Sequence, residues 1–379
     1  MNKKILIVGA VIIVILLIII LIPKKSDGNT IKIGHIDFVT GPLASIGEAA
    51  KKGAELAVED INAAGGIKGK KVEYLVEDYA YDGKKVIPSY EALMNKGIQY
   101  LIVEGSTAAA ILNPIAKEKK QFMLVPSAFT PVWKDGNPLT CRIALTADSY
   151  GAATADYLLK HFNKPKIAIL VSNNEYGKGM MDVLSKGVEA GGGKVVITDT
   201  YEQAGGDFRT QLTKIKGVES QLDAVFTLNS GASVEPLFKE IKELKITKPI
   251  ISDTSTVSNS NLKDRSLVEG VVYSDYPLSP MRSDDDTPKA HDMKERYFQK
   301  FGEEPGTFSV QSYDAMMILA RAIEDSDDTL SQGISDFLIH KIGTYEGVNG
   351  KFTFNNDCEV DRPVVMRVVK DGKPVLLTQ

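Results

Sequence analysis

The sequence has little of what metal centres and most catalytic sites require. Its 379 residues include four histidines, none at ligand spacing from another, and two cysteines, which are too few to make a zinc site alone. No G-x-G-x-x-G follows an expected strand, and the P-loop, H-E-x-x-H and G-x-S-x-G motifs do not occur. The sequence therefore predicts a protein that is not an enzyme and that has no cofactor and no metal.

Neither positive nor negative charge predominates in the sequence. The formal net charge is −4, and basic residues form no run beyond pairs and triples. Because nucleic-acid-binding surfaces need a dense basic patch, we expect no nucleic-acid partner. The acidic clusters within 284–286 and 325–328 lack the spacing of an EF-hand loop. We expect solvated loops at both places, with a calcium site as the alternative.

One long hydrophobic run is present, close to the N-terminus. Residues 5–22 are apolar throughout and are flanked by lysine pairs, and their length approaches the ~20 residues that cross a bilayer. Neither a small-residue cleavage site nor a lipoprotein cysteine follows the run. We therefore predict a single-pass transmembrane anchor at 5–22 and a stem at 23–29, with the rest of the chain extracellular. A cleaved signal peptide is the alternative.

The remaining chain alternates short apolar runs with helical patterns, and it does so twice. A chain of 379 residues suggests about two domains. Strands are expected at 31–36, 72–76, 100–103 and 122–125, and again at 166–171, 194–200, 223–228 and 249–252. Helices are expected at 48–61, 106–119, 177–190, 207–216, 232–244, 286–300 and 307–324, with strands in the last 35 residues. This alternation predicts two α/β units with doubly wound parallel sheets.

Open parallel sheets bind ligands at the carboxyl ends of their strands, and this rule selects two sets of loops. They are 38–47, 78–82, 104–107 and 126–130 in the first unit, and 172–176, 201–206, 229–233 and 252–256 in the second. The hydroxyls of Ser106, Thr107 and Ser230 stand at expected helix starts, where helix N–H groups favour anions such as carboxylates. Simple helix N-caps are the alternative.

Five segments resemble one known family. They are TGPLASIG (40–47), GAELAVEDINAAGGIKGKK (53–71), PSAFTP (126–131), NNEYGKGM (173–180) and SYDAMMILARAIE (312–324). In their order and spacing, these segments make residues 30–379 resemble the leucine/isoleucine/valine-binding proteins, which are type I solute-binding proteins of ABC importers. The resemblance implies two α/β lobes joined by crossing segments near 142–148, 272–278 and 358–364. The implied lobes are 30–145 plus 276–360, and 146–275 plus 361–379.

The resemblance also implies a ligand site between the lobes. The first-lobe positions that hold the ligand carboxylate in amino-acid-binding relatives are similar to Ser106, Ser127, Ala128 and Phe129, with Thr107 beside them at a helix start. Relatives often have threonine where Phe129 stands, and phenylalanine lacks the hydroxyl. Either the ligand lacks the polar group that such a hydroxyl would bind, or the match between this segment and the relatives shifts by one residue.

Three further positions complete the implied site. Tyr176 matches an aromatic contact from the second lobe, and Ile46 matches an aromatic wall residue. Asp253 matches an acidic residue that pairs with the ligand ammonium. For Asp253 a helix N-cap is the alternative, because a buried charge needs a partner in either case.

The implied crossing segments bear on the two cysteines. Cys141 lies just before the first crossing and Cys358 just before the third, so their Cα atoms could come within the ~4.4–6.8 Å that a bridge requires. We expect two free thiols, since cysteine is often buried, with a disulfide as the alternative. Tyr81 occupies one cysteine position of a disulfide found in some relatives.

The residues and the resemblance together predict a membrane-anchored extracellular solute-binding protein. It would deliver a small polar solute, with an amino acid favoured, to the permease subunits of an ABC importer. The alternatives are a ligand-sensing ectodomain and a binder of an amide, urea-type or carboxylate solute.

Overall fold

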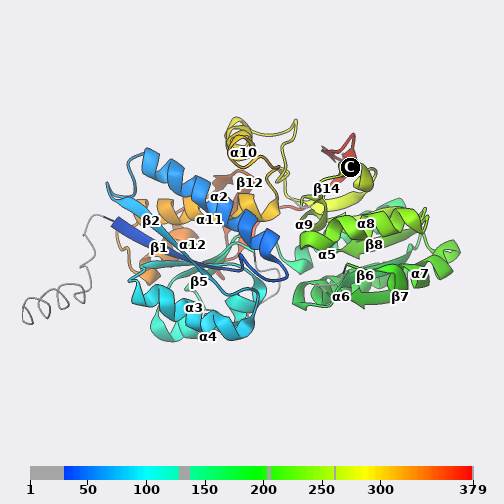
Figure 1. The fold of residues 1–379 in the computed structure, drawn as a ribbon, viewed down its shortest axis with the longest axis horizontal. Helices are drawn as coiled ribbons and strands as arrows, with labels where there is room; N and C mark the ends of the chain where they lie inside the picture. Colours follow the sequence, from blue (N-terminus) through cyan, green and yellow to red (C-terminus); the bar gives the residue numbers. More distant parts are fainter. Residues whose placement is uncertain (1–29, 128–136, 203–205, 260–261, 378–379) are drawn as a thin grey trace, which may run out of the picture.

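The computed structural model describes residues 30–127, 137–202, 206–259 and 262–377. These residues form two α/β lobes that lie side by side, the first with blue and cyan strands and the second with green strands (Figure 1). The predicted parallel sheets are confirmed in both lobes.

The first lobe is built on a five-stranded sheet in the order β2-β1-β3-β4-β5, in which every paired neighbour is parallel. Its strands are β1 (Thr30–Asp37), β2 (Lys71–Asp78), β3 (Tyr100–Val103), β4 (Met123–Val125) and β5 (Thr140–Arg142). Its early helices are α2 (Ala44–Ala63), α3 (Gly83–Asn95) and α4 (Ser106–Lys119). β3 and β4 are buried throughout, which is why the sequence reads there as continuous apolar runs.

Helices cover both faces of this sheet. Successive side chains of a strand point to opposite faces, so Leu101 packs with α3 and α4, whereas Ile102 packs with α2. Beside α2 lie α10 (Pro288–Phe301) and α11 (Thr307–Asp325), and α12 (Ser331–His340) packs against α11; all three come from much later in the chain. Gly53 lets α2 approach α11 closely, because a β-carbon there would lie 1.9 Å from the Ser309 carbonyl oxygen.

The second lobe is built on a seven-stranded sheet in the order β15-β14-β10-β9-β8-β6-β7. Its strands are β6 (Lys166–Ser172), β7 (Lys194–Tyr201), β8 (Ala224–Leu228), β9 (Ile250–Asp253), β10 (Val272–Asp275), β14 (Val365–Lys370) and β15 (Lys373–Leu376). Its helices are α5 (Ala147–His161), α6 (Glu175–Ala190), α7 (Arg209–Val218), α8 (Val234–Glu243) and α9 (Thr254–Val257). The pairs from β7 to β10 are parallel, and the C-terminal strands β14 and β15 add antiparallel pairs.

The chain passes between the two large sheets after β5, after β10 and after a small antiparallel sheet. That small sheet consists of β11 (Tyr345–Gly347), β12 (Gly350–Phe354) and β13 (Val360–Asp361). Arg362, on the third passage, donates to the Ile143 carbonyl of the first passage at 3.2 Å. Its guanidinium also lies 5.0 Å from the ring centre of Tyr276 on the second passage. One buried cation therefore contacts all three passages.

A disulfide joins Cys141 of β5 to Cys358, with the Cα atoms 4.7 Å apart. The expectation of two free thiols is therefore wrong, and the alternative is correct. The Arg142 N–H donates to the Cys358 carbonyl at 2.9 Å, so these two stretches run side by side and bring the sulfurs together. The bridge spans 217 residues of sequence, and such a link stabilises the fold by about 2–5 kcal/mol.

The acidic cluster at 284–286 is not a purely solvated loop. Asp284 is mostly exposed, but the Asp286 side chain is 2% exposed and forms an ion pair with buried Lys294. Asp285 pairs with Arg367 of β14 at 2.8 Å. Within the described residues, no group of three or more potential metal ligands stands close enough together to hold an ion.

The predicted anchor at 5–22 and stem at 23–29 lie outside the described residues. Among the helices that are described, none combines the length and the apolar character that a membrane span requires.

Candidate functional site

A small cavity lies between the lobes, where the carboxyl ends of both parallel sheets meet. Its volume is about 50 Å³. The first lobe contributes Phe38, Leu43, Ile46, Tyr81, Gly105, Ser106 and Ser127, and also Phe308 of α11. The second lobe contributes Asn174, Tyr176, Ser230 and Ser255. Except for Phe308, these residues all lie in the loops that the strand-end rule selected.

The residues predicted from the sequence fall into three groups. Ile46, Ser106, Ser127 and Tyr176 line the cavity. Thr107, on the first turn of α4, and Asp253 are not among the lining residues. Ala128 and Phe129 lie outside the described residues.

The N-cap alternative is wrong for Ser106 and Thr107, whereas Ser230 does occupy an N-cap position. Gly105 is the N-cap of α4, so Ser106 and Thr107 stand inside the helix. Ser230 precedes a short 3₁₀ turn, but its side chain makes no capping hydrogen bond. Gly105 has a positive φ of 86°, and a β-carbon there would lie 2.7 Å from the Tyr79 hydroxyl. Glycine is therefore required where α4 begins at the cavity.

Glu104, the residue after β3, binds the Ser127 side chain on the side away from the cavity. The Ser127 hydroxyl donates to the Glu104 carboxylate, and the Gly105 N–H donates to Ser127 Oγ at 3.2 Å. The same carboxylate accepts a hydrogen bond from the Ser312 hydroxyl of α11. Glu104 is 0% exposed, so these hydroxyls replace the water that its charge loses on burial.

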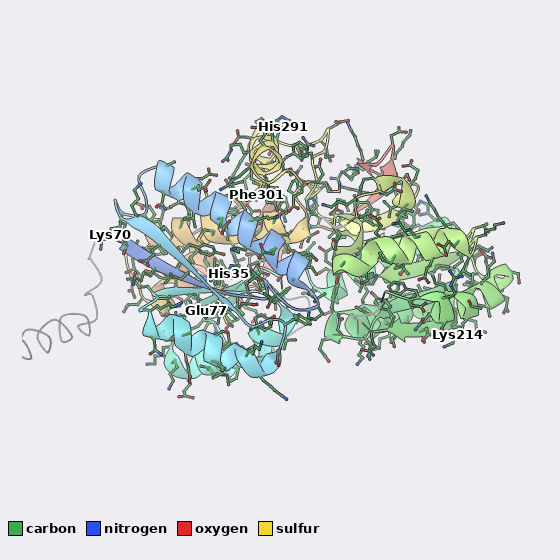
Figure 2. All side chains as sticks on the ribbon, viewed as in Figure 1. His35, Lys70, Glu77, Lys214, His291 and Phe301 are labelled. Atoms are coloured by element: carbon green, nitrogen blue, oxygen red, sulfur yellow. A yellow bond between two sulfur atoms is a disulfide. The ribbon has the colours of Figure 1, made fainter. Side chains whose placement is uncertain are left out.

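A group of buried ionisable side chains lies behind Glu104, on β1 and β2. His35, which Figure 2 shows inside the first lobe, places Nε2 3.6 Å from the Glu104 carboxylate and Nδ1 2.5 Å from the Tyr74 hydroxyl. Burial raises the pKa of Asp37 to about 7, against the attraction of His35. Burial lowers the pKa of His35, but the charges of Asp37 and Glu104 outweigh it and leave this pKa raised.

Asp253 ends β9 and caps the short helix α9, so the N-cap alternative describes its structural role correctly. Its carboxylate accepts from the Thr256 N–H at 3.1 Å, from the Ser255 hydroxyl at 2.8 Å and from the Tyr176 hydroxyl. Burial raises the pKa of Asp253, and the Tyr176 bond is the largest of the effects that lower it. Asp253 therefore stands one side chain behind the cavity wall, and ligand contact by Asp253 stays a prediction.

Aromatic and aliphatic side chains form the rest of the wall. Phe38 meets Tyr81 edge-on, with ring centres 5.2 Å apart, and Ile46 and Leu43 pack in the same cluster. Sequence reasoning missed Phe38 and Tyr81 as wall residues, although both lie in loops that the strand-end rule selected. Phe308 carried no such signal, because it belongs to a helix from a distant part of the sequence.

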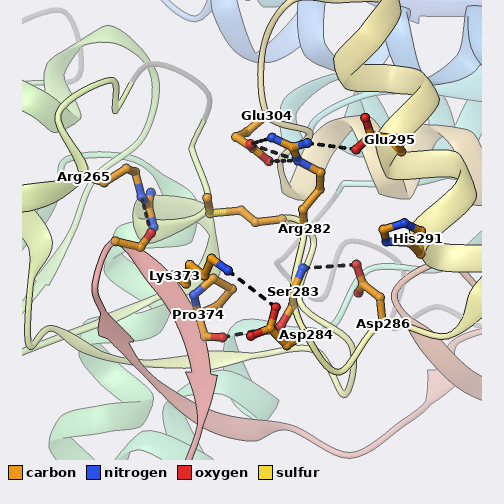
Figure 3. A pocket seen from close by; sticks show the side chains of 12 residues that line it. Arg265, Arg282, Ser283, Asp284, Asp286, His291, Glu295, Glu304, Lys373 and Pro374 are labelled. Atoms are coloured by element: carbon orange, nitrogen blue, oxygen red, sulfur yellow. Dashed lines mark hydrogen bonds and ion pairs between the residues drawn. The ribbon is translucent and has the colours of Figure 1, made fainter.

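A larger hollow of about 650 Å³ lies on the outside of the molecule, near the second passage between the lobes. Figure 3 shows Arg282 bound to both Glu304 and Glu295, and Lys373 facing Asp284. These charges already pair with one another, and the hollow lacks the apolar walls that enclose a small ligand. The cavity between the lobes is the better candidate for a ligand site.

Replacing Tyr176 by phenylalanine would remove one donor from Asp253 and keep the ring. Because the lost bond lowers the Asp253 pKa, this pKa should rise further above its unfolded value in the variant. A carboxyl whose folded pKa is raised stabilises the fold below its unfolded pKa and loses that contribution as pH rises. The variant's loss of unfolding free energy should therefore be larger at pH 8 than at about pH 4, near the ordinary aspartate pKa, and should approach about 1–3 kcal/mol, as measured by urea unfolding.

Tyr157 of α5 provides the matched control in the same lobe. It is partly exposed, and its hydroxyl has no hydrogen-bond partner among the described residues. Tyr157→Phe should show no pH-dependent loss of unfolding free energy. A loss in Tyr176→Phe that is the same at both pH values would contradict the link between this hydroxyl and the Asp253 charge.

Comparison with known proteins gives a consistent picture. A family model described as periplasmic binding protein matches residues 30–373. The chain is 24% identical to the leucine-, isoleucine-, valine-, threonine- and alanine-binding protein of Pseudomonas aeruginosa, over 86% of each chain. It is 26% identical to the Leu/Ile/Val-binding protein of Escherichia coli, again over 86% of each chain.

Solved structures with the same fold include two binders of different ligands. The substrate-binding protein of a branched-chain amino acid transporter from Streptococcus pneumoniae, in complex with isoleucine, has a TM-score of 0.80 at 25% identity and covers 92% of this chain and 100% of its own. A solute-binding protein of an ABC transporter from Rhodopseudomonas palustris, in complex with 3,4-dihydroxybenzoic acid, has a TM-score of 0.84 and covers 92% and 97%. Its identity of 20% makes that likeness one of fold alone.

Proposed function

The chain belongs to the periplasmic binding protein family, and from this premise we propose that it captures an amino acid between its lobes and delivers it to an ABC permease. As a member of this family it is a solute-binding protein. The proposal adds the class of solute, the transfer to a permease and the attachment to a membrane.

The main support for the proposal is that the two walls of the cavity favour opposite charges on a bound solute. On the first lobe, α4 begins at the cavity with Gly105 and Ser106, and the amino end of a helix favours a carboxylate. On the second lobe, Tyr176 and Ser255 line the cavity and bind the buried Asp253 carboxylate, which favours an ammonium. A zwitterion satisfies both walls.

The relatives support the same class of solute. The Pseudomonas and Escherichia proteins are named for branched-chain amino acids, and the Streptococcus protein is in complex with isoleucine. The apolar wall of Phe38, Leu43 and Ile46 suits an aliphatic side chain. We propose that Thr107, Ala128 and Phe129 assist in holding the ligand carboxylate, as the sequence predicts.

Entry of the solute requires the lobes to separate. A cavity of about 50 Å³ is far below the roughly 300–1,000 Å³ of typical ligand sites. We propose that the lobes, with the boundaries predicted from the sequence, rotate about the three passages between them and close over the solute. The bridge between Cys141 of β5 and Cys358 lies before the first and third passages, so it does not oppose this rotation.

The solute class can be tested by thermal unfolding of the full chain with L-leucine, L-isoleucine, L-valine or benzoate. An amino acid at ~100 times its dissociation constant should stabilise the fold by about 2.7 kcal/mol, which is a rise of several degrees in Tm. Asp253→Asn should abolish most of this rise, because it removes the charge and keeps the shape.

Asp314→Asn is the matched control for that variant. Asp314 is also a fully buried carboxylate, but it binds the Val348 N–H and is not among the residues that line the cavity. The control should keep the rise in Tm. If benzoate stabilises the parent best, or if Asp253→Asn responds to amino acids as the parent does, the proposed solute class or the role of Asp253 is wrong.

We also propose that residues 5–22 anchor the protein in the cell membrane with both lobes outside. The support is the uninterrupted apolar run, which approaches the ~20 residues of a span and lacks a cleavage site. In intact cells the full chain should sediment with membranes, and external protease should release the lobes. Recovery of a mature protein that begins near residue 24 in the medium would overturn the anchor.

A further inference from the structure

Three of the hydroxyl groups that line the cavity share one orientation. Ser127 on the first lobe and Tyr176 and Ser255 on the second each donate to a carboxylate that lies behind the cavity wall. The carboxylates, Glu104 and Asp253, are both 0% exposed. The hydrogens of these three hydroxyls therefore point away from the cavity.

At Ser127 this orientation decides what the side chain can offer a solute. A serine hydroxyl has one hydrogen and two lone pairs. The hydrogen goes to Glu104, and one lone pair accepts the Gly105 N–H at 3.2 Å. What remains for the cavity is a second lone pair, which is a hydrogen-bond acceptor.

We propose that Glu104 is a positioning residue that fixes Ser127 as an acceptor, so that the cleft selects a solute bringing an N–H donor, such as a primary ammonium, to this point. The inference rests on the proposed function and deepens it: the ammonium attracted by Asp253 from the second lobe would also donate to Ser127 on the first lobe. It also changes the role that the resemblance implies for Ser127, from a donor to the ligand carboxylate to an acceptor from the ligand amine.

The surroundings of Glu104 keep this arrangement in place. The Ser312 hydroxyl of α11 donates to the same carboxylate, and the Tyr79 hydroxyl donates to the Glu104 carbonyl at 3.0 Å. His35 faces the carboxylate from β1, with Nε2 at 3.6 Å, and Asp37 and Tyr74 stand behind the imidazole. The Ser127 and Ser312 hydroxyls both donate to this carboxylate, which therefore acts as their acceptor.

The first test needs no solute. A neutron crystal structure of the full chain, exchanged into heavy water, would locate the deuterium of the Ser127 hydroxyl. We expect it on the line to the Glu104 carboxylate. A deuterium that points into the cavity would overturn the proposal, whatever the solute proves to be.

The second test compares L-leucine with 4-methylpentanoate, which has the same chain and carboxylate but no amine. Ser127→Ala should weaken leucine binding roughly 10-fold to 100-fold, as expected for a hydrogen bond to a charged group, and change 4-methylpentanoate binding by less than about threefold. Isothermal titration measures both affinities. Equal losses for the two compounds would show that Ser127 serves the carboxylate, and the proposal would fall.

Glu104→Gln tests the positioning role itself. If Glu104 acts through Ser127, the variant should narrow the preference for leucine over 4-methylpentanoate in the parent and should not change it in a Ser127→Ala background. Asp314→Asn, which neutralises another buried carboxylate of the same lobe, should leave the preference unchanged. If Glu104→Gln reduces the preference for leucine equally in the parent and in the Ser127→Ala variant, the proposal is contradicted.

Two outcomes separate this inference from the proposed function. A parent that binds neither compound counts against the proposed solute class, and the neutron result then decides the role of Glu104. If Glu104→Gln does not fold, the Ser127→Ala comparison and the deuterium position decide it.

Discussion

The structure of the cleft depends on the need to keep two buried carboxylates hydrogen-bonded. Glu104 and Asp253 are both fully buried at the ends of parallel strands, where an unsatisfied charge would cost several kcal/mol. Each carboxylate takes its hydrogen bonds largely from hydroxyls, and some of these, Ser127, Tyr176 and Ser255, also form the cavity wall. The same bonds that make the burial tolerable therefore set the polarity that a solute meets.

The passages between the lobes impose the second constraint. Arg362 contacts the first and second passages from the third, and it also packs 4.0 Å from the ring centre of Phe352. The disulfide fixes β5, just before the first passage, to the stretch before the third. In the proposed rotation of the lobes, the contacts of Arg362 with the first and second passages lie where the hinge would bend.

Regular elements and site loops were predictable from the sequence because they depend on local patterns. The helix expected at 106–119 is α4, and the strand expected at 100–103 is β3. The bond from Ser312 to Glu104 was not predictable, because it joins residues 208 positions apart and depends on how α11 packs. The pairing of the two cysteines likewise depends on crossings that no local pattern reveals. The same holds for the direction of the Ser127 hydroxyl, which follows from the burial of Glu104.

The most direct measurement is a crystal structure of the full chain with L-leucine. The account predicts leucine between Ser127 and Tyr176, with its ammonium within hydrogen-bond distance of Ser127 Oγ and its carboxylate at the start of α4. Leucine in the outer hollow beside Arg282 would contradict the account. So would leucine between the lobes with its carboxylate against Ser127.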